Sequence, residues 1–297
     1  MKYVITGAAG NISKLLAERL LKSGNQVTVI GRNAEHLSAL KQQGATVAVG
    51  SVEDVDFLKK TFAGADAVYT MVPPHLAATD WKSWIATIGK NYADAIAANN
   101  VKYVVNLSSI GAHLEDGCGP VSGLHRAEEE FNKLKNTNVL HLRPSYFFNN
   151  LLANVGLAKH MNIIGSNFGG ENKKIVLVDP ADIAEVAFDA LSNLNFKGHT
   201  VKYIASDERS GNEIANVLGN AIGKPELPWV VFSDEQAVGG MLQAGLPEEV
   251  AKNYAEMGHS LESGKMFEDY WKNHPEKLGK TKLEDFAKTF AAVYSQN

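Results

Sequence analysis

The fold of this chain is decided by Thr6-Gly7-Ala8-Ala9-Gly10-Asn11-Ile12, a glycine-rich turn near the start of the sequence. An apolar run at 3–5 precedes the turn, and leucines and isoleucines recur at helical spacing over 12–21. The sequence therefore predicts a strand, a tight turn and a helix in direct succession, the setting in which such a motif binds a dinucleotide. Gly7 would allow the sharp turn, and Gly10 would let the backbone approach a pyrophosphate at the helix N-terminus. An ordinary strand-turn-helix without a ligand is the alternative.

The end of the second predicted strand indicates which dinucleotide is bound. An apolar run at 27–30 leads into Gly31, Arg32 and Asn33, and the nearest acid downstream is Glu35. Sites for NAD usually place an acid here to hold the ribose 2′-hydroxyl, whereas an arginine suits the 2′-phosphate of NADP. We therefore predict NADP(H) as the cofactor, with Arg32 on the phosphate. The alternative is that Arg32 is a solvated surface residue.

Composition limits the classes of function. The chain has 297 residues, 45% of them hydrophobic and 21% charged, with a net charge of −4, which is typical of a globular protein and gives no sign of a nucleic-acid surface. A single cysteine, Cys118, excludes an intramolecular disulfide and a cysteine-based zinc site. The dispersed histidines show no metal-ligand spacing. We find no signal peptide and no membrane-spanning run, so we expect a cytoplasmic protein without metal, nucleic-acid or membrane partners, either monomeric or homodimeric.

Further apolar runs at 46–49, 67–72, 103–107 and 139–142 alternate with helical patterns. This alternation predicts an α/β fold of the Rossmann type, with a doubly wound parallel sheet. Ligands of such sheets lie beyond the carboxyl ends of the strands, near the switch in strand order. The cofactor-binding residues predicted on this basis are Thr6, Gly7, Ala9, Gly10, Asn11, Ile12, Arg32, Ser51, Val52, Met71, Val72, Pro73, Leu107, Ser108 and Ser109.

The organisation of the chain changes after about residue 150. Asp179 and Pro180 indicate the start of a helix, with the acid at the cap and the proline at the first helical position. From about residue 210 onward the pattern is helical and more polar. We predict an NAD(P)-binding Rossmann domain over 1–150, a returning strand-helix-strand segment at about 174–205, and a smaller, mostly helical C-terminal lobe over 206–297 that covers the cofactor cleft.

Several motifs together carry a family resemblance. They are the glycine turn, the segments 29–33 and 107–109, the segments 124–129 and 142–150, and three stretches near the C-terminus at 245–247, 263–264 and 281–286. In these motifs the chain resembles the NmrA-like group of atypical short-chain dehydrogenase/reductases, and within it the type-2 NAD(P)H:quinone oxidoreductases. The resemblance runs nearly end to end.

The sequence departs from this pattern at two positions. Ser13 replaces the third glycine of the turn, which normally allows close packing of the helix. Ser51 replaces the acid that commonly follows the third strand and helps to hold adenosine. Both departures concern the affinity for the cofactor more than its identity.

The usual chemistry of short-chain dehydrogenases is not expected here. It relies on a tyrosine and on a lysine four residues later that lowers the tyrosine pKa, and no tyrosine of this chain has lysine at that spacing. Ser108 and Ser109 lie where that class keeps its serine, but the partners are missing. A quinone needs mainly close placement against the nicotinamide, because the cofactor carries the chemistry. The resemblance therefore implies an NADPH-dependent reductase of a small-molecule substrate, a quinone or similar electrophile.

The candidate proton donors are His125 and Tyr146, and the resemblance places Pro74, Phe147 and Asn150 in the substrate pocket. The alternatives are a structural role for His125 and plain core packing for the aromatic residues. The acids at 128–130 are expected to form a solvated helix face, with one of them able to anchor His125. Two other functions stay open: a non-catalytic NADP(H)-binding redox sensor of the NmrA type, and a reductase of another small carbonyl or unsaturated substrate.

Overall fold

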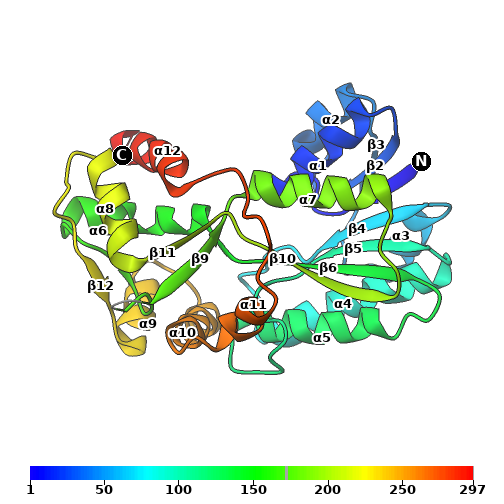
Figure 1. Ribbon diagram of the computed structural model, residues 1–297. Coiled ribbons are helices and arrows are strands. Elements are labelled where there is room, and N and C mark those ends of the chain that lie inside the picture. The colour runs from blue at the N-terminus through cyan, green and yellow to red at the C-terminus, as the bar shows by residue number, and fades with distance from the viewer. Residues whose placement is uncertain (171–172, 297) are drawn as a thin grey trace.

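A seven-stranded parallel sheet forms the larger part of the molecule (Figure 1). The computed structural model describes residues 1–170 and 173–296. The strands of this sheet are β1 (Lys2–Ile5), β2 (Gln26–Gly31), β3 (Thr46–Val49), β4 (Ala67–Met71), β5 (Tyr103–Leu107), β6 (Asn138–Pro144) and β10 (His199–Ile204). Their order is β10-β6-β5-β4-β1-β2-β3. This arrangement confirms the predicted doubly wound fold, with the switch in strand order between β1 and β4.

Helices cover both faces of the sheet, which is why its strands are apolar runs rather than alternating ones. One face carries α1 (Asn11–Lys22), η1 (Glu35–Leu37), α2 (Ser38–Gln42) and α7 (Pro180–Asn193). The other face carries α3 (Val55–Phe62), α4 (Trp81–Ala98) and α5 (Pro120–Asn132). Along β1, Val4 faces the second set while Tyr3 and Ile5 face the first.

Local sequence signals fix two of these helices. Asp80 caps α4 by accepting a hydrogen bond from the backbone N–H of Ser83 at 3.0 Å. Asp179 caps α7 in the same way, through Ala181 N–H at 2.7 Å, with Pro180 in the first turn as the sequence predicted.

The smaller lobe lies beside the carboxyl ends of the central strands (Figure 1). It holds two small sheets and most of the C-terminal helices, and it also includes residues 146–178, which the predicted lobe over 206–297 did not contain. Its strands are β7 (Tyr146–Phe147), β8 (Ile164–Ser166), β9 (Lys174–Val178), β11 (Asp207–Ser210) and β12 (Trp229–Val231). Its helices are η2 (Phe148–Asn154), α6 (Val155–His160), α8 (Gly211–Ala221), α9 (Asp234–Gln243), α10 (Glu248–Glu262), η3 (Lys265–Phe267), α11 (Glu268–Lys272) and α12 (Leu283–Gln296).

The segment 174–205 does not return to the central sheet as a unit. Only α7 and β10 do so, whereas β9 pairs with β7 and β11 in the lobe. The local pattern could not reveal this, because a strand buried on both faces has the same apolar composition in either sheet.

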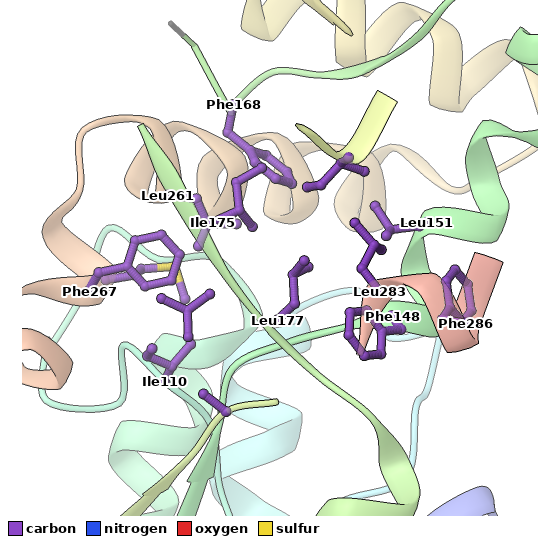
Figure 2. Packing of buried hydrophobic residues seen from close by; sticks show 14 of the residues in the cluster. Ile110, Phe148, Leu151, Phe168, Ile175, Leu177, Leu261, Phe267, Leu283 and Phe286 are labelled. Atoms are coloured by element: carbon purple, nitrogen blue, oxygen red, sulfur yellow. The ribbon is translucent and has the colours of Figure 1, made fainter. Parts of the chain in front are cut away.

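The core of the lobe forms around β9 (Figure 2). Ile175 and Leu177 of β9 are buried among side chains from η2, α10 and η3. Phe148 stacks on Phe286 of α12, with ring centroids 5.4 Å apart. Ile110, from the loop after β5, belongs to the same cluster. The lobe is therefore packed directly onto the Rossmann domain.

Across residues 1–170 and 173–296, no helix combines the length and the apolar character needed to cross a membrane.

Candidate active site

The candidate cofactor residues lie in the loops that follow β1 to β5, at the edge of the sheet that faces the lobe. Thr6 ties the first of these loops to β4. Its backbone N–H donates to Tyr69 O at 3.1 Å, and its hydroxyl oxygen accepts from Met71 N–H at 2.9 Å. The Thr6 side chain is fully buried. It therefore braces the two strands that flank the switch point.

The two glycines of the turn have different tasks. Gly7 has a positive φ of 61°, and a Cβ there would lie 2.3 Å from Met71 Sδ, so the fold itself requires glycine. Gly10 is exposed, and a Cβ there would meet only Gly7 O, at 3.2 Å. Gly10 is also the N-cap of α1 and has no side chain to occupy the helix end. Ala9 and Asn11 beside it are exposed, and Ile12 is buried.

This turn fits a dinucleotide. The first turn of α1 contains no acidic side chain, so its free N–H groups and its positive dipole end are open to an anion. Ser13 is buried in the place of the third glycine, against the core of the sheet.

Arg32 is exposed immediately after β2, at the position expected for a 2′-phosphate contact. An acid that the sequence reasoning missed, Glu53, lies near it. Trp84 Nε1 donates to the Glu53 carboxylate at 2.9 Å and Ser51 Oγ donates at 3.2 Å. The Trp84 hydrogen bond is the main cause of a lowered pKa for Glu53, and His75 and Arg32 add to the effect. The ionised Glu53 carboxylate therefore lies near Arg32. It belongs to the loop after β3 and not to the end of β2, where an acid that selects NAD would be expected.

The loop that carries Ser51 and Val52 is fixed from α4. Asn91 Nδ2 donates to Val52 O at 3.3 Å and to Glu53 O at 3.2 Å. The His75 ring, from the loop after β4, stacks on Trp84 with centroids 4.8 Å apart. These contacts hold the loops after β3 and β4 against α4, an arrangement that no local sequence signal indicated.

The loops after β4 and β5 form the central part of the site. Met71, Val72 and Pro73 are half-buried there, whereas Pro74 is exposed. Leu107 ends β5. The Ser108 hydroxyl is buried and has no hydrogen-bond partner among the residues that the structure describes. A buried hydroxyl of this kind is expected to bind a ligand or water.

The Ser109 hydroxyl, in contrast, donates to Ile110 O at 3.0 Å. Of the two serines in this loop, only Ser108 therefore has its hydroxyl free for a ligand.

His125 lies on α5 and is anchored by the loop before that helix. Its Nδ1 is 2.9 Å from Ala112 O, so this nitrogen carries the proton and donates it to the carbonyl. Its Nε2 is 3.9 Å from a Glu129 carboxylate oxygen, and 20% of the side chain is exposed. The anchoring leaves Nε2 as the nitrogen that can face a ligand.

Tyr146 is half-buried on β7 and lies edge-on to Phe168 at 5.2 Å. Burial raises the pKa of Tyr146 well above its usual range, and Tyr254 adds to this effect. Tyr146 therefore keeps its proton at neutral pH and can donate it in a hydrogen bond. Phe147, the next residue, is also half-buried.

Tyr254, on α10 of the lobe, is a second tyrosine of this region that the sequence reasoning missed. It packs edge-on against Trp81 at 5.3 Å, in a cluster that includes Val72 and Leu124. Burial raises the pKa of Tyr254 as well. The position of Tyr254 depends on how α10 of the lobe packs against the Rossmann domain, and the helical periodicity of the sequence does not predict that packing.

The last predicted substrate residue, Asn150, is exposed. Its neighbour Asn149 instead lines a hollow of about 370 Å³, together with Asn11 and Asp179. Among the described residues, no group of three or more histidine, cysteine or acidic side chains is placed to hold a metal ion.

The motif segments at 124–129 and 142–150 meet in a buried ion pair. Arg143 donates to Glu128 through Nε at 3.0 Å and through Nη2 at 2.7 Å. Its Nη1 donates to the Tyr203 hydroxyl at 3.0 Å and lies 3.4 Å from Asp269 of α11. Glu128 is therefore not part of a solvated face as expected, because this residue is only 4% exposed. Glu129 is the exposed one.

The chain is similar to several known proteins. A family described as NAD(P)H-binding matches residues 7–193. The chain is 24% identical over 222 residues to a (4-alkanoyl-5-oxo-2,5-dihydrofuran-3-yl)methyl phosphate reductase of Streptomyces griseus, covering 75% of this chain and 74% of that one. It is 23% identical over 250 residues to an NAD(P)H azoreductase of Xenophilus azovorans, covering 84% and 83%.

Among solved structures, the fold is similar to that of an NADPH-dependent quinone oxidoreductase from Escherichia coli in complex with NADPH. The TM-score is 0.82 at 22% identity, over 97% of this chain and 99% of that one. The family match covers more than half of the chain and includes the glycine turn from Gly7 onward, so the NAD(P)H-binding family that the motifs predicted is confirmed. The chain belongs to the NAD(P)H-binding family.

Proposed function

We propose that the chain is an NADPH-dependent oxidoreductase that transfers hydride to quinones or similar small electrophiles. The observation that carries the proposal is the placement of the glycine turn. It lies at the same edge of the sheet as Ser108 and as the end of β6, after which Tyr146 follows, and Tyr254 packs in a cluster with Val72 of the loop after β4. The relatives named above reduce chemically different acceptors, which supports a reductase and leaves the acceptor open.

In this proposal, the Rossmann domain, made of residues 1–144 with α7 and β10, holds the cofactor, and the lobe, made of residues 146–178 and 206–297, covers the acceptor. NADPH, when bound, supplies the hydride. The free N–H groups of α1 hold the pyrophosphate and Arg32 holds the 2′-phosphate. Tyr146 and Tyr254 are the groups that can donate a hydrogen bond or a proton to the reduced acceptor oxygen. His125 Nε2 can do the same when the ring carries a second proton besides the one on Nδ1. Phe147 and Pro74 provide apolar contact.

A second candidate function is a non-catalytic NADP(H) sensor. The missing tyrosine-lysine pair favours it, because no proton relay of the usual kind is available. Steady-state NADPH oxidation with a panel of benzoquinones and naphthoquinones separates the two. If the protein binds NADPH tightly but consumes none with any of these acceptors, the sensor is the better assignment.

Arg32→Ala is expected to weaken the binding of NADPH about 10- to 100-fold and to change that of NADH little. The loss of a charge-assisted phosphate contact costs about 1.5–3 kcal/mol. Titration calorimetry with both dinucleotides measures the difference, and Lys41→Ala, an exposed cation on α2, is the control. Equal weakening of both dinucleotides would show that Arg32 does not recognise the phosphate.

His125→Ala is expected to lower turnover with a naphthoquinone about tenfold without changing the Kd for NADPH. General acid assistance contributes roughly 10²–10⁴-fold, and we expect solvent to replace part of it for so reactive an acceptor. Stopped-flow and steady-state assays of NADPH oxidation measure this, with the exposed His36→Ala as the control. A fully active His125→Ala protein would leave only the structural role that the bond to Ala112 indicates.

A further inference from the structure

The chain passes between the Rossmann domain and the lobe at three places, and all three meet. The chain passes from the Rossmann domain to the lobe between β6 and β7, returns to the domain between β9 and α7, and enters the lobe again between β10 and β11. At the first passage, Ser145 donates both its N–H and its hydroxyl to Ile204 O at 3.0 Å, which ties β7 to the end of β10.

Ser206 joins the second passage to the third. Its N–H donates to Leu177 O at 2.7 Å, and its hydroxyl oxygen accepts from Asp179 N–H at 3.0 Å. The same hydroxyl donates to Asp182 Oδ2 at 2.6 Å. Ser206 is fully buried and Asp182 is 6% exposed, so this bond is shielded from water.

The segment between α11 and α12, residues 273–282, is here called the strap. It crosses the middle of the molecule and passes over the same point (Figure 1). Asp182 accepts from Lys280 N–H at 3.2 Å and from Thr281 N–H at 3.1 Å. Gly279 N–H donates to Ala205 O at 2.7 Å. A Cβ on Gly279 would lie 2.3 Å from Asp182 Oδ2, so the strap lies directly on the carboxylate.

The Asp182 carboxylate is surrounded by hydrogen-bond donors at this point. The carboxylate accepts three hydrogen bonds and lies in the first turn of α7, near the positive end of the helix dipole. The Lys282 ammonium donates to Ser206 O and to Gly279 O. One buried acid therefore connects the second passage, the third passage and the strap.

This point is linked to the candidate site by a short path. Ser206 N–H holds Leu177 O, and Leu177 is paired with Tyr146 across β9 and β7. We propose that the Asp182 carboxylate is a positioning residue that sets where the C-terminal lobe, and with it Tyr146, lies over the cofactor cleft. The catalytic part of this inference rests on the proposed function; the positioning of the lobe does not.

Asp182→Asn tests it, because asparagine keeps the shape but removes the charge and places an N–H₂ group against donors. We expect the KM for 1,4-naphthoquinone to rise at least fivefold, roughly 1 kcal/mol, while the Kd for NADPH stays within twofold. Hydrogen exchange should become faster in the strap at 279–282 and around 146–147. The matched control is Glu185→Gln, one turn along α7, which contacts the same strap only through the exposed Lys280 ammonium and should behave like the wild type.

The proposed quinone reduction and the positioning role of Asp182 can be tested separately. A wild-type protein that reduces no quinone, with exchange still faster in Asp182→Asn, would remove the proposed reaction and keep the positioning role. Unchanged exchange and KM in Asp182→Asn would overturn the inference, as would a loss of NADPH affinity in step with the rise in KM. If Asp182→Asn does not fold, Ser206→Ala is the alternative, because it removes one of the three hydrogen bonds to Asp182. It should raise the KM and the hydrogen-exchange rates in the same places, by smaller factors.

Discussion

Gly10→Val is expected to abolish NADPH binding in a protein that remains folded. Gly10 has φ −82° and ψ 163°, a conformation that valine adopts readily, and its Cβ would meet only Gly7 O at 3.2 Å. The isopropyl group would instead occupy the space in front of α1 where the pyrophosphate approaches. The loss of two hydrogen bonds to a charged group costs about 3–6 kcal/mol, more than roughly 100-fold in affinity.

NADPH fluorescence titration together with far-ultraviolet circular dichroism measures the two effects. Gly240→Val is the control, because Gly240 is exposed on α9 with open space around it. Gly7→Val should behave differently and lose the fold as well, since φ at Gly7 is positive and Met71 fills the space. Retained NADPH binding in Gly10→Val would mean that the turn serves only the fold.

Arg143→Ala is expected to lower the free energy of unfolding by about 3–5 kcal/mol, because it leaves the Glu128 carboxylate buried without its partner. The two side chains are 9% and 5% exposed, so water cannot replace the lost contact. Urea unfolding followed by tryptophan fluorescence measures this. Lys90→Ala, which breaks the exposed pair with Asp94, is the control and should cost about 0–1 kcal/mol.

The double variant Arg143→Met with Glu128→Leu separates the burial of a charge from the loss of packing. Replacing both partners by apolar residues of similar size is often neutral, so we expect this variant to recover most of the stability. If Arg143→Ala is no more harmful than Lys90→Ala, the pair is not the stabilising link between α5, β6 and α11 that its geometry indicates.

The sequence predicted those parts of the fold whose signals are local. The glycine turn identified β1 and α1, and Asp179 with Pro180 identified the start of α7. The pairing of β9 was not predictable, because it depends on β11, which begins about 30 residues later. Strands of two to four residues, such as β7 and β11, are also too short to show a period.

The same distinction applies to the site. Arg32 could be placed from the sequence because it directly follows the apolar run of β2. Gly10 could be placed because it directly precedes the helical pattern of α1. Glu53, Tyr254 and Asp182 could not, because each takes its role from a partner far along the chain. For Glu53 that partner is Trp84, for Tyr254 it is Trp81, and for Asp182 it is the strap.

The three passages between the domain and the lobe also bear on how the molecule unfolds. Neither part is a continuous stretch of chain: β7, η2, α6, β8 and β9 of the lobe are inserted between β6 and α7 of the Rossmann domain. Shortening the chain at about residue 206 would remove β11, α10 and α12, and with them much of the apolar cover over β9. The core of the lobe includes Ile110 and Tyr203 of the Rossmann domain, and the core beside α1 and α7 includes Val178 of β9. We therefore expect the two parts to melt together in one cooperative transition, and a protease cut within the lobe to destabilise the nucleotide-binding half as well.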